Sequence, residues 1–195
     1  MNKTLLEKRR QERKDEILET AAKLFVKNGY HSTTMDDMAR ELMVTKPAIY
    51  YHFRNKLDIL KHIEDKIVLP MNDILKIDGC HISPKEKLRS IINTKVKYNC
   101  GSYGFTLIRF EEMKIFSRRT SKSISKMETE IEYLVRKVLK EGEEQGIFKI
   151  DDIKTTSLFI LGIVNWVYRW YRLNGKLTPK QIADKAMNFI ERALI

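Results

Sequence analysis

The side chains best suited to chemistry gather in the stretch TKPAIYYHF, residues 45–53, which Arg54, Asn55 and Lys56 follow at once. Lysine can donate hydrogen bonds to guanine acceptors, and an alanine or threonine methyl group can contact the methyl group of thymine. Tyrosine and histidine reach phosphate oxygens with one polar tip, and hydroxyls at a helix start can do the same. The pattern therefore predicts contacts with double-stranded DNA from Thr33, Thr34, Thr45, Lys46, Pro47, Ala48, Tyr50, Tyr51, His52 and Lys56.

These residues need short helices to position them. An apolar stripe predicts a first helix over roughly residues 8–28, which Gly29 ends. A second begins at HSTTMDDMARELMV, and a third begins near Thr45, with Pro47 in its first turn. Two short helices joined by a tight turn form a helix-turn-helix, whose second helix enters the major groove by its N-terminal end. We expect Thr45, Lys46 and Ala48 to face base edges, while Ile49 and Phe53 hold the helix on its domain. The competing interpretation makes the aromatic residues a core cluster of a helical bundle.

The order of these pieces closely resembles the DNA-binding domain of TetR-family transcriptional regulators. The resemblance covers about residues 11–71 and rests on AAKLFVKNGYHSTT, MARELMVTKPAIYYHF and NKLDIL. It implies an all-α homodimer in which three N-terminal helices bind a palindromic operator. It also implies a C-terminal bundle, residues 72–195, that holds a ligand pocket and a four-helix dimer interface, and release of DNA when ligand binds. Met43 departs from the family, which usually has glycine there, and a left-handed turn would be uncomfortable for methionine.

The rest of the chain also reads as helical. A long helix is expected from Asn55, with a kink or break near Leu69 because Pro70 lies inside its apolar pattern. Further helices are predicted at roughly 84–100, 103–118, 121–145, 152–174 and 178–194. The helix at 152–174 carries two apolar stripes on neighbouring faces, which suggests burial on two sides: Phe159, Ile163, Trp166 and Trp170, and Ile160, Val164, Val167 and Tyr171. The last helix carries one stripe at matching spacing: Ile182, Ala186, Phe189 and Ala193.

A small-molecule effector is suggested by NWVYRWYR, residues 165–172, which resembles a segment of the acyl-CoA-responsive branch of the family. Arginine suits the phosphates of CoA, and the cations at 118, 119, 122 and 126 agree with that ligand. In the simpler interpretation the tryptophans pack a dimer interface, the arginines form its rim, and the cations make a solvated face. Candidate ligand-binding residues are Leu107, Phe110, Trp166, Arg169, Trp170 and Arg172.

Composition narrows the function classes. Across 195 residues, 37 Lys and Arg face 26 Asp and Glu, and a net charge of +11 suits an anionic partner. The first 71 residues carry 14 basic and 11 acidic residues and the remainder 23 and 15, so most of the surplus lies outside the predicted DNA-binding domain. No glycine-rich phosphate loop, nucleophile with a matched base, or paired metal ligands occur, so we expect no enzyme, no cofactor and no metal.

The N-terminus lacks an apolar signal segment, and the strongest apolar run is too short to span a bilayer. Together with the two isolated cysteines, this predicts a cytoplasmic protein with no membrane partner. One alternative function stays open, a DNA-bound factor that acts through protein partners. A helical interaction module with no DNA role is a further alternative, but TKPAIYYHF and Lys56 argue strongly against it.

Overall fold

The computed structural model describes residues 2–101, 115, 118–172 and 174–194. These residues form helices and no strand, which confirms the all-α prediction. The helices are α1 (Asn2–Asn28), α2 (Met35–Glu41), α3 (Lys46–Tyr50), α4 (Lys56–Leu75), the 3-10 helix η1 (Lys76–Gly79), α5 (Pro84–Cys100), α7 (Arg118–Glu144), α8 (Ile153–Asn165), α9 (Val167–Trp170) and α10 (Pro179–Ala193). The helix predicted at 103–118 lies almost entirely outside the described residues.

Local sequence explains most of the helix ends. Gly29, with φ of 87°, follows α1 in the left-handed conformation that only glycine adopts at no steric cost. Thr34, Ser83 and Thr178 cap α2, α5 and α10. Each cap hydroxyl accepts from the backbone N–H three residues later, and the acidic or amide side chain of that residue accepts from the backbone N–H of the cap. The predicted restart at Thr178-Pro179 is confirmed.

Helix α4 does not break at the proline. Of the kink or break expected near Leu69, the break is wrong, since the helix runs from Lys56 to Leu75 with Pro70 inside it. The buried stripe Ile63, Ile67, Met71 and Ile74 continues on both sides of the ring. Burial of this stripe offsets the backbone hydrogen bond that Pro70 cannot donate.

The helix predicted at 152–174 is instead two helices, α8 and α9, which meet at Trp166. The Trp166 carbonyl accepts from the Arg169 N–H at 3.0 Å, the tighter spacing of a 3-10 turn. Near this junction the side-chain amide of Asn99, on α5, donates to the Val164 carbonyl at 2.8 Å. The helical stretch then ends at Trp170, because Tyr171 is extended.

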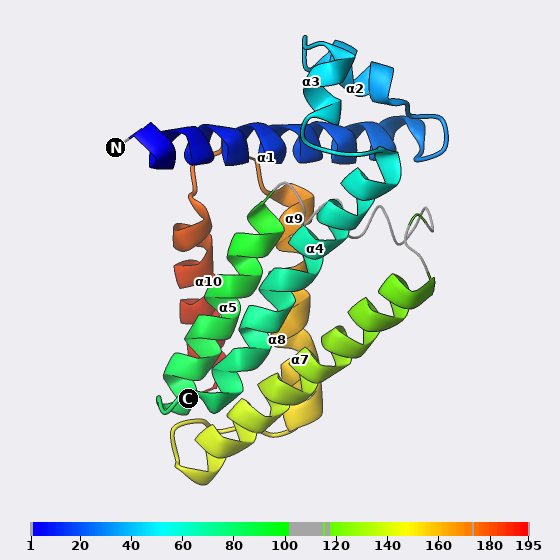
Figure 1. Ribbon diagram of the computed structural model, residues 1–195. Helices are drawn as coiled ribbons and strands as arrows, with labels where there is room; N and C mark the ends of the chain where they lie inside the picture. Colours follow the sequence, from blue (N-terminus) through cyan, green and yellow to red (C-terminus); the bar gives the residue numbers. More distant parts are fainter. Residues whose placement is uncertain (1, 102–114, 116–117, 173, 195) are drawn as a thin grey trace. The chain divides into compact units, whose positions relative to one another are not determined.

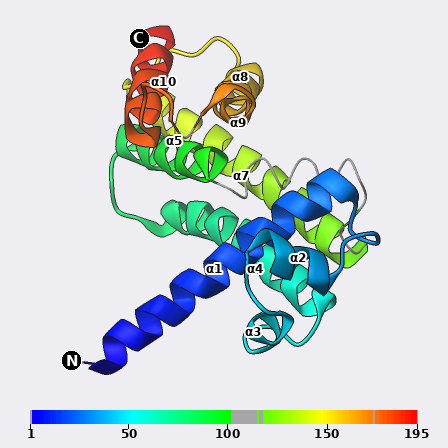
Figure 2. The same ribbon diagram turned by 90° about the horizontal axis from the view of Figure 1, so that it is seen from above.

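The chain divides into two compact units, and the boundary between Ile67 and Val68 falls within α4. The N-terminal unit holds the described residues of Met1–Ile67, with α1, α2 and α3. The C-terminal unit holds those of Val68–Phe105 and Arg118–Ile195. In the C-terminal unit α5 packs against α7, α8 and α10 (Figures 1 and 2). Its core is aliphatic, with Leu88, Ile91, Ile92 and Val96 from α5 and Ile131, Val135 and Val138 from α7.

The two cysteines have different surroundings. Cys80, directly after η1, is exposed, whereas Cys100 at the end of α5 is buried. Burial raises the pKa of the Cys100 thiol to about 11. No helix among the described residues is both long and apolar enough to cross a membrane.

Candidate functional site

Helices α2 and α3 pack against each other across a tight turn at Leu42–Val44. The Val44 N–H closes the turn by donating to the Ala39 carbonyl at 2.9 Å. Met43 occupies the left-handed region with φ of 52°, and no other described residue except glycine has a positive φ. Its side chain is 93% exposed and gains almost no packing in return. The sequence-based concern about methionine at this position is confirmed.

Helix α3 has one buried side and one exposed side. Ile49 and Phe53 are fully buried, as predicted, and anchor the helix. Thr45 is the N-cap residue and Pro47 lies in the first turn, but the Thr45 hydroxyl makes no capping bond and stays available. The outward side is made by Thr45, Lys46, Pro47, Ala48, Tyr50 and Tyr51, all exposed.

The Lys46 ammonium is held by α2. It donates to the Asp36 carboxylate at 2.8 Å, and both side chains are largely exposed. This hydrogen bond raises the pKa of Lys46. An exposed ion pair of this kind is worth little and exchanges readily with solvent or a new partner. Lys46 can therefore turn to a base acceptor without a large loss of stability.

Tyr51 and His52 contact the first helix. The Arg10 guanidinium carbon lies 5.4 Å from the centre of the Tyr51 ring, a cation–π distance. The Tyr51 and His52 rings meet edge to face at 5.0 Å. A hollow of about 320 Å³ beside them is lined by Arg13, Ile17, Val44, Ala48, Tyr51 and His52.

The environment of His52 keeps it neutral. Burial lowers its pKa, and the positive charges of Lys14, Arg10 and Arg13 lower it further. Its Nδ1 is buried and has no hydrogen-bond partner among the described residues. His52 therefore brings no positive charge to a phosphate near neutral pH.

The cations of α1 were missed from the sequence. Arg10, Arg13 and Lys14 lie at i, i+3 and i+4, so they share one helical face. That spacing was visible in the sequence, but the tertiary contact with Tyr51 was not.

The structure corrects the expectation for the threonine pair. The Thr33 side chain is fully buried, and its hydroxyl lies 2.8 Å from the Gly29 carbonyl and 3.3 Å from that of Leu24. The Thr34 hydroxyl and N–H both donate to the Asp37 carboxylate, at 2.7 and 2.9 Å. Asp37 thus occupies the anion position at the start of α2, and neither hydroxyl is free for phosphate.

Lys56 is also committed within the fold. Its ammonium donates to the carbonyls of Tyr30, His31 and Thr33 at 2.6, 3.0 and 2.7 Å. It also lies 4.6 Å from the centre of the Tyr30 ring. An ammonium has three donors, and all three are used here. The arrangement fastens the loop after α1 to the start of α4 and does not support Lys56 as a phosphate contact.

The C-terminal unit contains a cavity of about 430 Å³ among α5, α7 and α8. Its walls carry both polar and apolar groups: Lys95, Ser125, Glu128, Thr129, Ile131, Glu132, Leu158, Leu161, Gly162 and Asn165. A Cβ at Gly162 would meet no atom within 4 Å, so the space over α8 is open there. The volume falls in the usual range for small-molecule sites, about 300–1,000 Å³.

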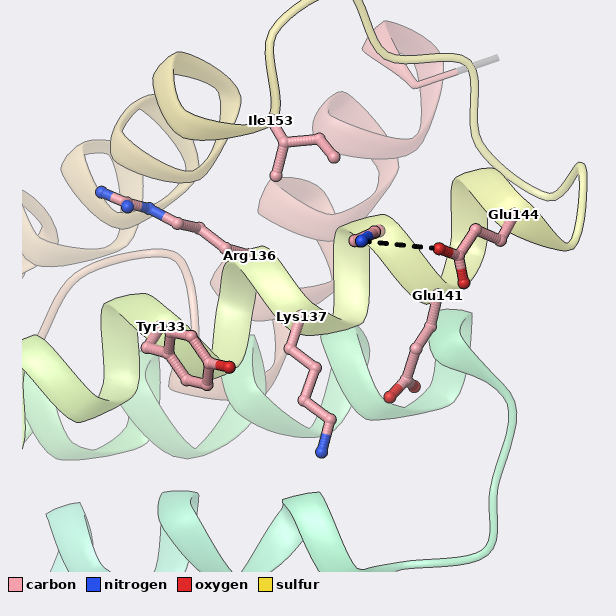
Figure 3. A pocket seen from close by; sticks show the side chains of 7 residues that line it. Tyr133, Arg136, Lys137, Glu141, Glu144 and Ile153 are labelled. Atoms are coloured by element: carbon pink, nitrogen blue, oxygen red, sulfur yellow. Dashed lines mark ion pairs between the residues drawn. The ribbon is translucent and has the colours of Figure 1, made fainter.

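A second hollow, lined by α7 and by Ile153 at the start of α8, is larger at about 520 Å³ (Figure 3). Lys140 pairs with Glu144 at 3.7 Å, the contact dashed in Figure 3. Arg136 pairs with Glu132, Lys137 with Asp78 at 2.7 Å, and Glu141 with Lys87 at 2.9 Å. The cations of this groove therefore have partners within the fold, in ion pairs that are partly exposed.

The residues predicted to bind ligand do not line the cavity among α5, α7 and α8. Leu107 and Phe110 lie outside the described residues. Trp166, Arg169, Trp170 and Arg172 are all exposed, and the Arg169 guanidinium lies 5.4 Å from the centre of the Trp166 ring. None of these four is among the residues that line it. Their ligand contacts stay a prediction, and their exposure agrees better with the interface interpretation.

Helices α8, α9 and α10 expose a set of large apolar side chains, here called the aromatic face: Phe159, Trp166, Trp170 and Phe189. The second predicted stripe of this region is buried in the bundle at Ile160, Val164 and Val167. The stripe predicted for α10 is largely its outer side, since the buried residues of that helix are Ile182, Ala183, Met187 and Ile190. Large exposed apolar residues on adjacent helices mark an interaction surface.

Family models match both parts of this chain. Residues 17–63 match the model of the bacterial regulatory proteins, tetR family, and residues 81–194 match a tetracyclin repressor-like C-terminal domain. The transcriptional repressor KstR2 of Rhodococcus jostii (strain RHA1) is 24% identical over 91% of this chain and 89% of its own.

This chain is also similar to solved structures of regulators. The regulator PfmR from Thermus thermophilus has a TM-score of 0.68 and 29% identity over 90% of this chain and 97% of its own. AibR, solved with isovaleryl coenzyme A and operator DNA, has a TM-score of 0.64 and 26% identity over 91% of this chain and 97% of its own.

Proposed function

The chain belongs to the tetR family of bacterial regulatory proteins, and on that premise we propose that it is a ligand-responsive transcriptional repressor. One observation carries the DNA-binding part. Helix α3 is anchored by Ile49 and Phe53, while its opposite side, from Thr45 to Tyr51, is left without cover. A short helix held in this way is suited to enter the major groove.

The contacts with DNA divide by chemistry. Thr45, Lys46 and Ala48, at the start of α3, read base edges, with Lys46 exchanging Asp36 for a guanine acceptor. Tyr50 and Tyr51 contact phosphates, and Arg10 and Lys14 of α1 supply positive charge beside them. Pro47 sets the first turn, and His52 supports Tyr51 from behind.

The protein acts as a homodimer on a palindromic operator. The aromatic face supports this, because α8 and α10 of two copies would bury Phe159, Trp166 and Phe189 in a four-helix interface. Two recognition helices related by such an axis read half-sites about one helical turn apart or somewhat further.

The effector is a small molecule bound in the C-terminal unit, and acyl-CoA thioesters are its first candidate class. The cavity among α5, α7 and α8 supports a ligand, whereas a tightly filled bundle would favour a factor that acts through protein partners. AibR, a relative above one quarter identity, was solved with an acyl-CoA and operator DNA. Arg169 and Arg172 are then available at the surface for the phosphates of CoA.

The test has two stages. Duplexes selected from a random library by the purified protein should share a palindrome, and anisotropy then gives the affinity for it. Acyl-CoA thioesters, free CoA and free acids are then added to the complex and to the protein alone. We expect acyl-CoA thioesters of one chain-length class to release the protein from DNA and to raise the melting temperature of the free protein. A ligand at a hundred times its dissociation constant adds about 2.7 kcal/mol to the free energy of unfolding. Absence of a palindrome would contradict the repressor proposal, and tight operator binding that no compound relieves would favour protein partners.

A further inference from the structure

Helix α5 carries two buried lysines with opposite circumstances. Lys87 is 9% exposed and its ammonium pairs with the Glu141 carboxylate at 2.9 Å. Lys95, about two turns further along, is 8% exposed and has no hydrogen bond or ion pair with any residue that the structure describes. The ammonium of Lys87 therefore has an acceptor within the fold, whereas the ammonium of Lys95 has none among the described residues.

Lys95 lies in the wall of the cavity among α5, α7 and α8, and it is the one cation among the described residues that line it. Two carboxylates share the cavity. Glu132 is taken by Arg136, and Glu128 raises the pKa of Lys95 through its charge without forming an ion pair. Burial acts in the opposite direction and more strongly, so the pKa of Lys95 is lowered on balance.

A donor without a partner on a largely buried side chain destabilises a fold unless it reaches water or a ligand, so the position of Lys95 in the cavity wall calls for an explanation. The remaining walls suggest which partner is missing. Leu158 and Leu161 of α8 and Ile131 of α7 are apolar, and the open space over Gly162 adjoins them. Ser125, Thr129 and Asn165 add neutral polar groups. One strong donor beside an apolar wall suits a short hydrocarbon chain that ends in an oxygen acceptor.

We propose that the ammonium of Lys95 binds the carbonyl or carboxylate oxygen of a short acyl effector whose chain contacts Leu158 and Leu161. This inference rests on the proposed function and gives its cavity a ligand chemistry and an anchoring residue. A volume of about 430 Å³ accommodates the acyl part alone. A free acid would bind through its carboxylate, and a thioester through its carbonyl with the nucleotide outside the cavity.

The test compares Lys95→Met, Lys95→Gln and Lys97→Met in the full-length chain. Lys97 is the control because it is exposed on the same helix. It follows Lys95 by two residues, so its side chain points to the opposite side of α5 from that of Lys95. The probes are isovalerate, hexanoate, their CoA thioesters, free CoA, and hexylamine as a cationic control. Binding is measured by calorimetry, and the melting temperature is recorded with and without each probe.

Wild type and Lys97→Met should bind at least one acyl probe equally and ignore hexylamine. Lys95→Met should bind that probe roughly tenfold to a hundredfold more weakly, the loss expected for a hydrogen bond from a charged donor. Lys95→Gln keeps a neutral donor and should fall between the two. Without ligand, Lys95→Met should melt at or above the wild-type temperature, since it removes a largely buried charge whose desolvation outweighs the attraction of Glu128.

Other outcomes overturn the inference in distinguishable ways. A clear loss of unliganded stability in Lys95→Met would mean that the ammonium has a partner within the fold. Unchanged affinity in Lys95→Met would remove the anchor while leaving an acyl-responsive repressor intact. If no acyl probe binds the wild-type protein, the proposed ligand class is wrong. The proposed function is then tested separately, by whether the protein binds an operator and whether another compound releases it. Binding by the free acid but not the thioester, or the reverse, identifies the source of the acyl group.

Discussion

Substitution of Lys56 by alanine should act on stability and leave the electrostatics of DNA binding unchanged. The ammonium donates to three carbonyls at 2.6–3.0 Å and lies over the Tyr30 ring. A hydrogen bond to a charged group contributes roughly 1.5–3 kcal/mol, and a partly exposed cation–π contact adds about 0.5–1 kcal/mol.

These contributions do not add, because Lys56 is only half-buried and water can reach the vacated carbonyl of the exposed His31. We therefore expect Lys56→Ala to lower the free energy of unfolding by about 2 kcal/mol, well below the sum over three bonds. For a chain of this size that is a fall in melting temperature of roughly 4–8 °C. Lys61→Ala is the matched control, since Lys61 is exposed on the same helix and should change stability by less than about 0.5 kcal/mol.

The DNA assay decides between the two roles of Lys56. Affinity for one duplex is measured over a series of salt concentrations at a temperature where both variants are folded. A lost phosphate contact would reduce the slope of log affinity against log salt by about 0.9, whereas a purely structural lysine leaves the slope unchanged. A wild-type melting temperature combined with a shallower slope would refute the structural role.

Three further substitutions probe the N-terminal unit. Met43→Gly should raise the free energy of unfolding by about 0.5–1 kcal/mol in denaturant melts, because it relieves a left-handed backbone while the 93% exposed side chain contributes little packing. Met43→Ala should give no such gain. Equal stabilisation by both variants would show that the backbone conformation is not the cause. Lys46→Ala should relax preference at one base position by about 1–3 kcal/mol, while Tyr51→Ala should weaken cognate and scrambled duplexes alike; equal losses on both duplexes for Lys46→Ala would contradict base reading. Because the pKa of His52 is lowered in the fold, the unfolded chain takes up a proton at a higher pH than the folded chain does. Stability should therefore be lost as pH falls through about 6.5. Thermal melts at a series of pH values should show a flatter profile in this range for His52→Gln.

The features that followed from the sequence are those with local causes. The position of Pro47, the buried pair Ile49 and Phe53, and the strained Met43 all depend on neighbours within one or two turns. Burial of one side of the segment at 153–170 was also visible, because Ile160, Val164 and Val167 meet its own bundle, whereas burial of the exposed second stripe stays a prediction.

The features that did not follow depend on distant parts of the chain. Lys56 reads as a phosphate contact until the carbonyls of residues 30–33 are found around its ammonium. The single helix expected at 152–174 gave no sign of its break at Trp166, where an amide from Asn99 meets the nearby backbone. Lys95 differs from Lys87 only in what α7 places opposite each of them, which periodicity alone does not reveal.

The unequal cysteines make the chain chemically addressable at a single position. A thiol-reactive probe modifies the thiolate, so the burial and raised pKa of Cys100 protect it while the exposed Cys80 reacts. Unmodified protein can therefore carry one fluorophore or spin label per chain without any mutation. In the proposed symmetric dimer the distance between the two labels can be measured as effector or operator is added, and it would report the conformational change proposed between the DNA-bound and released states.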